Sequence, residues 1–467
     1  MTYISDRLCV LFFAALATLM LITACTTAAP PASSDPTGDQ TGGAGAEGDA
    51  SAGPAGKDPA PVSPIEMAKD TPEDAAQKPA AVQMDKDGAP DQPGSAPADA
   101  QPAGTPSPQT TAAYVGPAGG EIGDRAAEIA GISAWLNSDP LTTTELRGKV
   151  ILIDFWTYTC INCIRTYPFL KLWNSRYTDD GLVIIGVHSP EFDFEKDLGN
   201  VTQATMEYGI IWPVALDNDF VTWSNYSNRF WPAKYLIDKD GIIRYTHFGE
   251  GQYAETENKI RELLKDAGAN ILNHDFAESV DQVLDPAFRG SNDAEVTREL
   301  YAGSDRNLPD RLYGGGGYAG QANYYLTQEA AANFALPGEL TPHQLYFQGR
   351  WLVSNENVTH GRVTGGFEDS INMVYSARSV NAVLTSGSGK PYRVRITMDG
   401  EYLTADNKGQ DVAIGDDGES YILVTGPRIY NVVENPQWVW RNKLTMSSNS
   451  DDFVLFAFTF GIYQKAS

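Results

Sequence analysis

Cysteine and histidine are both scarce in this chain, which contains four cysteines and five histidines among 467 residues. Cys9 and Cys25 lie near the amino terminus, so Cys160 and Cys163 are the thiols expected in a folded region. A structural zinc site usually needs four nitrogen or sulfur ligands. Because the chain has a single C-x-x-C pair and its histidines are dispersed, we expect no metal site and no bound cofactor.

Positive charge is also in short supply, with 34 lysines and arginines against 60 acidic residues and a net charge of −26. Nucleic acid and anionic membrane surfaces repel such a chain, so nucleic-acid binding is excluded. A single hydrophobic core stops growing at roughly 250–300 residues. The length therefore predicts two or three domains.

The first 25 residues have the pattern of an export signal. Arg7 precedes an apolar stretch from Leu8 to Ile22, and small residues end at Cys25. The last four, Ile-Thr-Ala-Cys, resemble a bacterial lipobox, which implies that residues 1–24 are a lipoprotein signal peptide and that Cys25 carries the lipid. The alternative is an ordinary signal peptide cleaved nearby, with Cys25 incidental.

Aromatic residues are absent from Thr26 to Thr111, where Ala, Pro, Gly, Ser and Asp dominate. Such a segment cannot bury enough apolar area to offset its chain entropy. We therefore predict a disordered tether over residues 25–118, with an r.m.s. span on the order of 50 Å.

Residues 119–268 alternate between apolar and amphipathic segments, which predicts an α/β layered sheet. Pro168 is expected to kink the helix that follows the first strand, and Asp240-Gly241 indicates a hairpin turn. The expected strands lie in 148–156, 181–192, 212–217 and 232–251, and the expected helices in 163–177, 201–210 and 254–268.

A C-x-x-C pair directly after the first central strand resembles the thioredoxin superfamily. Trp156 ahead of Cys160 and Cys163, and Pro232 in "WPAKYLID" before the hairpin, match that family's motifs. The extra helix and strand before Pro232 resemble the TlpA and ResA branch. The wording "GVHSPEF" is closer still to the extracytoplasmic carboxy-terminal part of DipZ proteins. The resemblance implies that Pro232 has a cis peptide bond and faces the cysteine pair.

The thiolate form of a cysteine attacks a disulfide, so a reactive cysteine needs a lowered pKa. The amino terminus of a helix stabilises an anion. We therefore expect Cys160 to be the exposed nucleophile and Cys163, one turn inward, to be the resolving thiol. A structural disulfide is an alternative for an exported protein. A peroxidase is a weaker one, because Ile153 stands where the Thr-x-x-Cys peroxidases have proline.

Asp154 lies within an apolar strand, six residues before Cys160. The resemblance assigns it proton transfer with Cys163, and the alternative is a capped or hydrated acid at a strand end. His188, at the end of the second strand, could stabilise a thiolate, although we favour a histidine satisfied in a loop. Trp156, Tyr158, His188 and Trp231 are candidates for the substrate rim, although aromatic residues beside a strand are more often packing.

The dipeptide Ile161-Asn162 between the cysteines does not indicate the direction of electron transfer. A buried acid without a nearby cation favours a reductase. The resemblance implies the same direction: reduction of exported protein substrates, including apocytochrome c. It also implies a CcdA- or DsbD-like membrane electron donor.

Short alternating segments after a linker at 269–289 predict a β-sandwich over residues 290–467. This region resembles the carbohydrate-binding-module-like jelly roll of DipZ proteins, through "TRELYAG", "GRW" and "FAFTFG". Trp351, Trp438 and Trp440 could stack on a glycan, although tryptophans of a sandwich are more often core. The alternative is a docking module that selects protein substrates.

The sequence thus predicts an α/β thioredoxin-like fold followed by an all-β jelly-roll sandwich, anchored outside the cytoplasm by a lipid. The expected activity is that of a thiol-disulfide oxidoreductase. The competing class is a non-enzymatic glycan-binding lipoprotein of the cell envelope, with the thioredoxin-like part as its scaffold.

Overall fold

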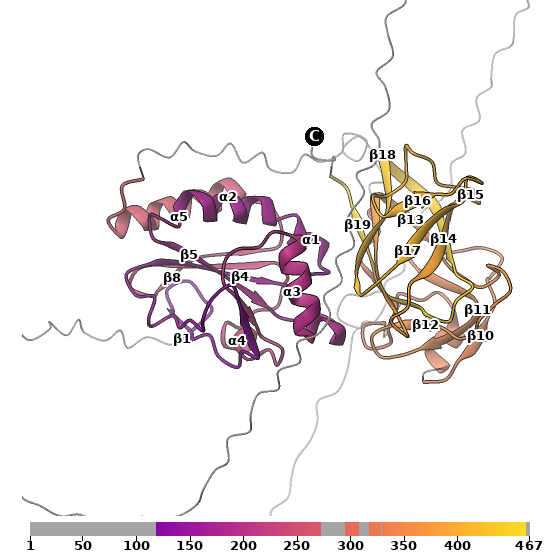
Figure 1. The fold of residues 1–467 in the computed structure, drawn as a ribbon, viewed down its shortest axis with the longest axis horizontal. Helices are drawn as coiled ribbons and strands as arrows, with labels where there is room; N and C mark the ends of the chain where they lie inside the picture. The colour runs from indigo at the N-terminus through magenta and orange to yellow at the C-terminus, as the bar shows by residue number, and fades with distance from the viewer. Residues whose placement is uncertain (1–117, 272–294, 308–316, 328, 464–467) are drawn as a thin grey trace, which may run out of the picture. The chain divides into compact units, whose positions relative to one another are not determined.

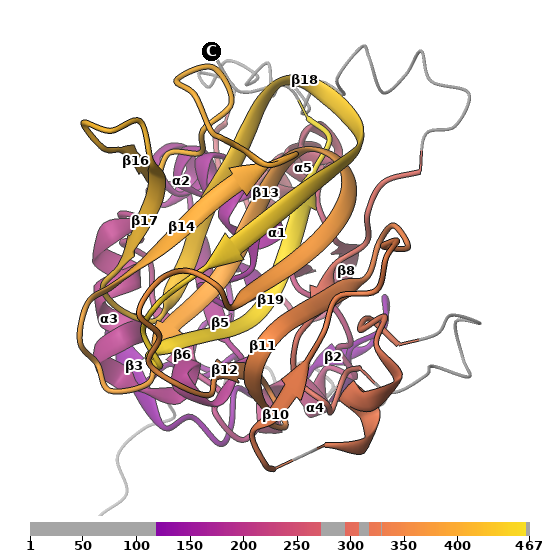
Figure 2. The same cartoon turned by 90° about the vertical axis from the view of Figure 1, so that its right-hand side faces the viewer.

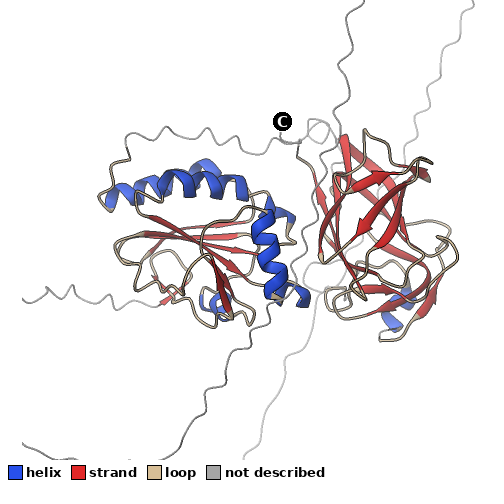
Figure 3. Ribbon diagram, viewed as in Figure 1, coloured by secondary structure: helices blue, strands red, loops and turns tan. Residues whose placement is uncertain are grey.

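A computed structural model of the chain describes residues 118–271, 295–307, 317–327 and 329–463. The expected signal peptide, Cys25, nearly all of the tether and most of the linker lie outside the described residues. Figure 3 separates an α/β part, residues 118–271, from a β part, residues 295–463. Within the described ranges, no helix is both long enough and apolar enough to cross a bilayer.

A six-stranded sheet forms the centre of the α/β part, in the order β3-β6-β5-β4-β7-β8. The central strand β4 is parallel to β5 and antiparallel to β7, and the edge strand β3 is antiparallel to β6. The six strands are β3 (Ala134–Leu136), β4 (Val150–Trp156), β5 (Leu182–His188), β6 (Val214–Leu216), β7 (Ala233–Ile237) and β8 (Ile243–Phe248). Two short strands, β1 (Ala118–Gly119) and β2 (Arg125–Ala126), form a separate parallel pair. The helices are α1 (Ile161–Ile164), α2 (Tyr167–Tyr177), η1 (Asp193–Lys196), α3 (Leu198–Glu207), α4 (Val221–Asn225) and α5 (Tyr253–Asp266).

Every residue of β4 is buried because the strand has helices on both of its faces. Figure 1 shows α2 and α5 covering one face of the sheet, with α4 on the other. Successive side chains of a strand point to opposite faces, so β4 contributes to two separate cores. One core contains Val150, Leu152 and Trp156, and the other contains Ile151, Ile153 and Phe155.

The predicted hairpin is confirmed: β7 and β8 pair in antiparallel register around Gly241, whose φ is +75°. Asp238 closes the turn by accepting hydrogen bonds from the N–H groups of Asp240 and Ile242, both at 2.9 Å.

The kink predicted at Pro168 is wrong. The first helix ends at Ile164 and a new one begins at Tyr167, so Pro168 occupies the first turn of α2. Proline lacks an N–H, and the first turn is where a helix needs none.

Eleven strands make up the sheet of the β part, which confirms the all-β sandwich. Its longest strands, β13 and β18, pair with three register shifts, and Figure 2 shows them crossing the domain. The strands are β9 (Leu300–Tyr301), β10 (Ala332–Phe334), β11 (Leu345–Val353), β12 (Val358–His360), β13 (Ser370–Ser386), β14 (Tyr392–Met398), β15 (Glu401–Tyr402), β16 (Val412–Ile414), β17 (Ser420–Val424), β18 (Arg428–Ser447) and β19 (Phe453–Gly461), with one short helix, η2 (Ala322–Leu326).

Two of the three tryptophans considered for glycan stacking lie inside the β part. Trp351 is fully buried and Trp438 is 9% exposed, whereas Trp440 is 52% exposed. Trp351 packs edge-on against Phe453 at 5.5 Å in the core. Stacking on a sugar is therefore open to Trp440 alone among the three.

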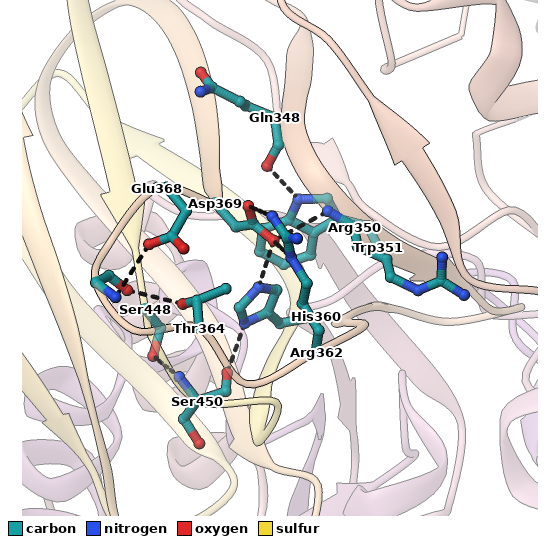
Figure 4. Close-up of polar contacts among 11 residues, drawn as sticks. Gln348, Arg350, Trp351, His360, Arg362, Thr364, Glu368, Asp369, Ser448 and Ser450 are labelled. Atoms are coloured by element: carbon teal, nitrogen blue, oxygen red, sulfur yellow. Dashed lines mark hydrogen bonds and ion pairs between the residues drawn. The ribbon is translucent and has the colours of Figure 1, made fainter.

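A polar cluster beside Trp351 is organised around the buried carboxylate of Asp369 (Figure 4). One carboxylate oxygen accepts hydrogen bonds from His360 Nε2 at 3.0 Å, from Arg362 Nε at 2.7 Å and from the Arg350 N–H at 3.1 Å. The other accepts from Arg362 Nη2 at 2.6 Å. Burial acts to raise the pKa of Asp369, but the bonds from Arg362 and His360 outweigh it and hold the pKa well below its usual range. Gly349 makes room for this carboxylate, since a Cβ there would lie 2.0 Å from it.

Candidate active site

Cys160 and Cys163 lie at the point where the central strand β4 gives way to helix α1. Cys160 is the N-cap residue of α1, and its Sγ accepts a hydrogen bond from the Cys163 N–H at 3.2 Å. Both cysteines are free thiols; Cys163 is buried and Cys160 is half-buried. The arrangement gives an outer sulfur and an inner sulfur on one helical turn.

The structure contradicts the expected lowering of the Cys160 pKa. Burial raises the pKa of Cys160 well above its ordinary value, and the Cys163 thiol and the charge of Glu191 add to this. The N–H of Cys163 acts in the opposite direction, but α1 has only four residues and offers one turn of aligned dipoles. Burial therefore favours the protonated thiol of Cys160 over the thiolate.

Asp154 forms a buried ion pair with Lys234 from the neighbouring strand. The two residues face each other in the β4–β7 register, with Lys234 Nζ 3.1 Å from Asp154 Oδ1, and both side chains are almost fully buried. Burial raises the pKa of Asp154, and the charge of Lys234 offsets only part of this effect. The pair also acts on Cys163, whose pKa is raised first by burial and then by Asp154, while Lys234 lowers it.

The expectation of a buried acid without a nearby cation is therefore wrong. Lys234 lies in the stretch "WPAKYLID". A lysine among apolar strand residues is the sequence feature that could have indicated a buried ion pair. The sequence does not show which acid a strand lysine meets, because that depends on the pairing of β7 with β4.

His188 is buried at the end of β5, and it does not lie in the loop expected for it. Burial lowers the pKa of His188 to about 3, so the ring is neutral near pH 7. Its Nε2 lies 3.3 Å from the Thr157 hydroxyl, in the turn before the cysteines. A neutral ring offers no cationic stabilisation to a thiolate.

Two of the expected rim residues are buried. Trp156 and Tyr158 are 1% and 2% exposed, because they pack around His188, with ring centroids at 4.9 and 5.8 Å from its ring. Trp231 is half-buried, and its Nε1 donates to the Ser189 carbonyl at 3.0 Å. The Trp231–Pro232 peptide bond is cis.

A second buried acid, Glu195, is one that the sequence pattern does not indicate. It lies in η1, directly after β5, and accepts a hydrogen bond from the Thr159 hydroxyl at 2.5 Å. Burial and the neighbouring Glu191 raise the pKa of Glu195 to about 7, against the hydrogen bonds that favour its charged form. The acid-rich stretch "EFDFEKD" has the composition of a solvated segment, and nothing in it indicates that one of its acids is buried.

The described residues contain no group of three or more histidine, cysteine or acidic side chains arranged to hold a metal ion. This edge of the sheet brings together two thiols, the buried Asp154–Lys234 ion pair and the buried acids Glu195 and Asp217.

Comparison with known proteins divides the chain in two. Residues 121–264 match the family model described as Redoxin, and residues 297–461 match the one described as Thioredoxin like C-terminal domain. The chain is 38% identical to Protein DipZ of Mycobacterium tuberculosis over 282 residues, which is 60% of this chain and 37% of that protein. It thus spans little more than a third of the length of DipZ.

Two shorter relatives are thiol-disulfide oxidoreductases by name. The thiol-disulfide oxidoreductase YkuV of Bacillus subtilis is 30% identical over 138 residues, 29% of this chain and 92% of YkuV. The thiol-disulfide oxidoreductase ResA of Bacillus thuringiensis is 26% identical over 128 residues, 27% of this chain and 71% of ResA. This chain therefore covers nearly all of YkuV.

Proposed function

The chain belongs to the thioredoxin-like thiol-disulfide oxidoreductases, and we propose that it reduces disulfides of exported proteins through a Cys160/Cys163 dithiol–disulfide cycle. The observation that carries this proposal is the outer thiol of Cys160 one turn from the inner thiol of Cys163, at the end of the central strand. Two sulfurs so placed can close an internal disulfide without rearranging the sheet.

In the first step the Cys160 thiol gives its proton to solvent, and the resulting thiolate attacks one sulfur of a substrate disulfide. A bond forms between Cys160 and the substrate, and the other substrate sulfur leaves as a thiolate that takes up a proton. In the second step the Cys163 thiolate attacks Cys160 Sγ and releases the second substrate sulfur. Two electrons and two protons pass to the substrate, which becomes a dithiol, while Cys160 and Cys163 become a disulfide.

We propose that Asp154 accepts the proton of the Cys163 thiol. Its buried carboxylate has a raised pKa, which makes it a stronger base than an ordinary aspartate. Lys234 holds the carboxylate in place at 3.1 Å and supplies the compensating charge. We also propose Pro232 and Trp231 as residues that contact the substrate.

We also propose where the protein works. Residues 25–118 tether two domains, 119–268 and 290–467, to a membrane through a lipid on Cys25, outside the cytoplasm. The electrons come from a CcdA- or DsbD-like membrane partner, and the substrates include proteins of cytochrome c maturation or of envelope redox homeostasis. Labelled palmitate entering the wild type but not Cys25→Ala tests the anchor; equal labelling of both contradicts it.

For the β part we favour docking of protein substrates over glycan binding, because two of the three candidate tryptophans, Trp351 and Trp438, are buried and cannot stack on a sugar. Retention of the full chain on a glycan array, lost in Trp440→Ala, would reverse this preference. A purely glycan-binding role is the competing expectation for this domain.

Insulin reduction in the presence of dithiothreitol tests the enzymatic proposal. The wild type accelerates precipitation of insulin, and Cys160→Ser brings the rate down to that of dithiothreitol alone. Cys163→Ser accumulates a mixed disulfide with the substrate, because no second thiol resolves it. Cys25→Ser is the matched control, which removes a cysteine from outside the pair and keeps the full rate. A Cys160→Ser protein as fast as the wild type would leave only a thioredoxin-like scaffold.

A further inference from the structure

Glu195 is a buried acid that the dithiol cycle does not use. Its side chain is fully buried, and no ion-pair partner reaches it among the residues that the structure describes. An isolated buried carboxylate is destabilising unless hydrogen bonds compensate it. Glu195 lies directly beside the cysteine turn, to which it is bonded through Thr159, so we considered a role for it at the dithiol site.

Four donors converge on the Glu195 carboxylate. Oε1 accepts from the Thr159 hydroxyl at 2.5 Å and from the Thr159 N–H at 3.3 Å. Oε2 accepts from the Glu191 N–H at 2.5 Å and from the Phe192 N–H at 3.1 Å. Three of the four are backbone N–H groups that can only donate, so the ionised carboxylate satisfies the set best.

These bonds connect two segments that flank the cysteines. Thr159 directly precedes Cys160, and Glu191 and Phe192 belong to the loop that leaves β5. The same loop holds Trp231, beside the cis peptide bond, through the Ser189 carbonyl. Glu195 therefore sets the distance between the turn that carries the nucleophile and the loop that supports Trp231.

We propose that Glu195 is a positioning residue of the dithiol site, which fixes the Cys160 turn and, through its negative charge, makes the pair a stronger reductant. This inference rests on the proposed dithiol cycle. A nearby anion disfavours the Cys160 thiolate, and a destabilised reduced form lowers the reduction potential. Glu191 acts on Cys160 in the same direction, and Tyr158 is the other titratable side chain that faces Glu195.

Glu195→Gln tests the proposal because it removes the charge and leaves one acceptor oxygen for four donors. Its amide NH₂ must face either the Thr159 donors or those of Glu191 and Phe192. We expect the equilibrium constant for reducing oxidised glutathione to fall about tenfold, equivalent to a potential about 30 mV less negative. The pH profile of Cys160 alkylation by iodoacetamide should move to lower pH.

Three further variants make the result specific. Glu195→Asp keeps the charge and should retain a potential near that of the wild type. Glu255→Gln removes an exposed acid from α5 and should change neither readout. Thr159→Val deletes the hydroxyl donor and weakens the charged form of Glu195, so the alkylation profile should move as in Glu195→Gln. This variant also provides the test if Glu195→Gln fails to fold.

A folded Glu195→Gln protein with the wild-type potential and alkylation profile would overturn the proposal, even if its melting temperature fell, because Glu195 would then be only a structural tie. The proposal also fails if Thr159→Val leaves the alkylation profile unchanged. Failure of the proposed function looks different: in that case the wild type itself forms no reversible Cys160–Cys163 disulfide in glutathione buffers.

Discussion

Asp154 in the α/β part and Asp369 in the β part are both buried carboxylates, yet their surroundings move the pKa in opposite directions. Asp154 has one cationic partner, Lys234, and burial prevails, so its pKa rises. Asp369 accepts four hydrogen bonds, two of them from the Arg362 guanidinium, and these prevail over burial, so its pKa falls.

The kind of donor explains the difference, because Glu195 also accepts four hydrogen bonds, all from neutral groups, and its pKa is still raised. Asp369 is held by both nitrogens of a charged guanidinium in addition to its other donors, and such a carboxylate keeps its charge over the whole physiological range, which suits a structural role. A carboxylate held by one lysine in an apolar strand gains less from ionising, and its proton is more easily exchanged. The β part therefore uses a buried acid to hold loops together, and the α/β part keeps one that can change protonation.

Asp369→Asn should have the largest effect on stability. An amide cannot accept from all of its present donors, and Arg362 loses its counter-charge. Arg362 is half-exposed, but His360 is buried, so the loss of its acceptor is not made good by water. Hydrogen exchange of the full chain should show faster exchange in peptides of β12 and β13, with insulin reduction unchanged.

Asp406→Asn, which alters an exposed acid of the same domain, is the control and should leave exchange as in the wild type. Wild-type exchange in Asp369→Asn would show that the cluster in Figure 4 is dispensable for folding.

Asp154→Asn should act on chemistry. It removes the proposed proton acceptor of Cys163, so release of the mixed disulfide slows by about tenfold or more near pH 7. Stopped-flow measurement of mixed-disulfide decay reports this step directly. Asp139→Asn, an exposed acid of the same domain, should decay at the wild-type rate. Equal rates for Asp154→Asn and the wild type would remove Asp154 from the mechanism.

The parts of the fold that depend on a local sequence pattern could be predicted. The buried strand around Asp154, the hairpin at Gly241 and the alternation in β14 follow from residues that are neighbours in the chain. The contacts that the site residues make with other segments do not follow from neighbouring residues. Lys234 meets Asp154 through strand pairing, and Glu195 meets Thr159 across 36 positions, so neither contact leaves a local signature.

The exposure of single aromatic side chains could not be predicted either. Trp351 and Trp440 look alike in the sequence, but one lies in the core and the other on the surface. Likewise, helix capping predicts an acidic Cys160, whereas desolvation in the folded protein reverses the direction. Both failures concern how much water reaches a side chain, which depends on the whole packing.

The two aspartates also predict opposite pH dependences of stability. Asp369, with a lowered pKa, contributes stability that is fully present above its unfolded-state value of about 3.9 and is lost as the pH falls through its folded pKa. Asp154, with a raised pKa, lowers stability progressively as the pH rises from about 3.9 through its folded pKa, because the unfolded chain ionises first.

Hydrogen exchange of wild type and each Asp→Asn variant, from acid to neutral pH, separates the contributions of the two aspartates. The destabilisation by Asp369→Asn should shrink in acid, whereas Asp154→Asn should become relatively more stable as the pH rises. Parallel curves for both variants would mean that the two carboxylates titrate alike, and the proposed division between a structural acid and a proton acceptor would fail.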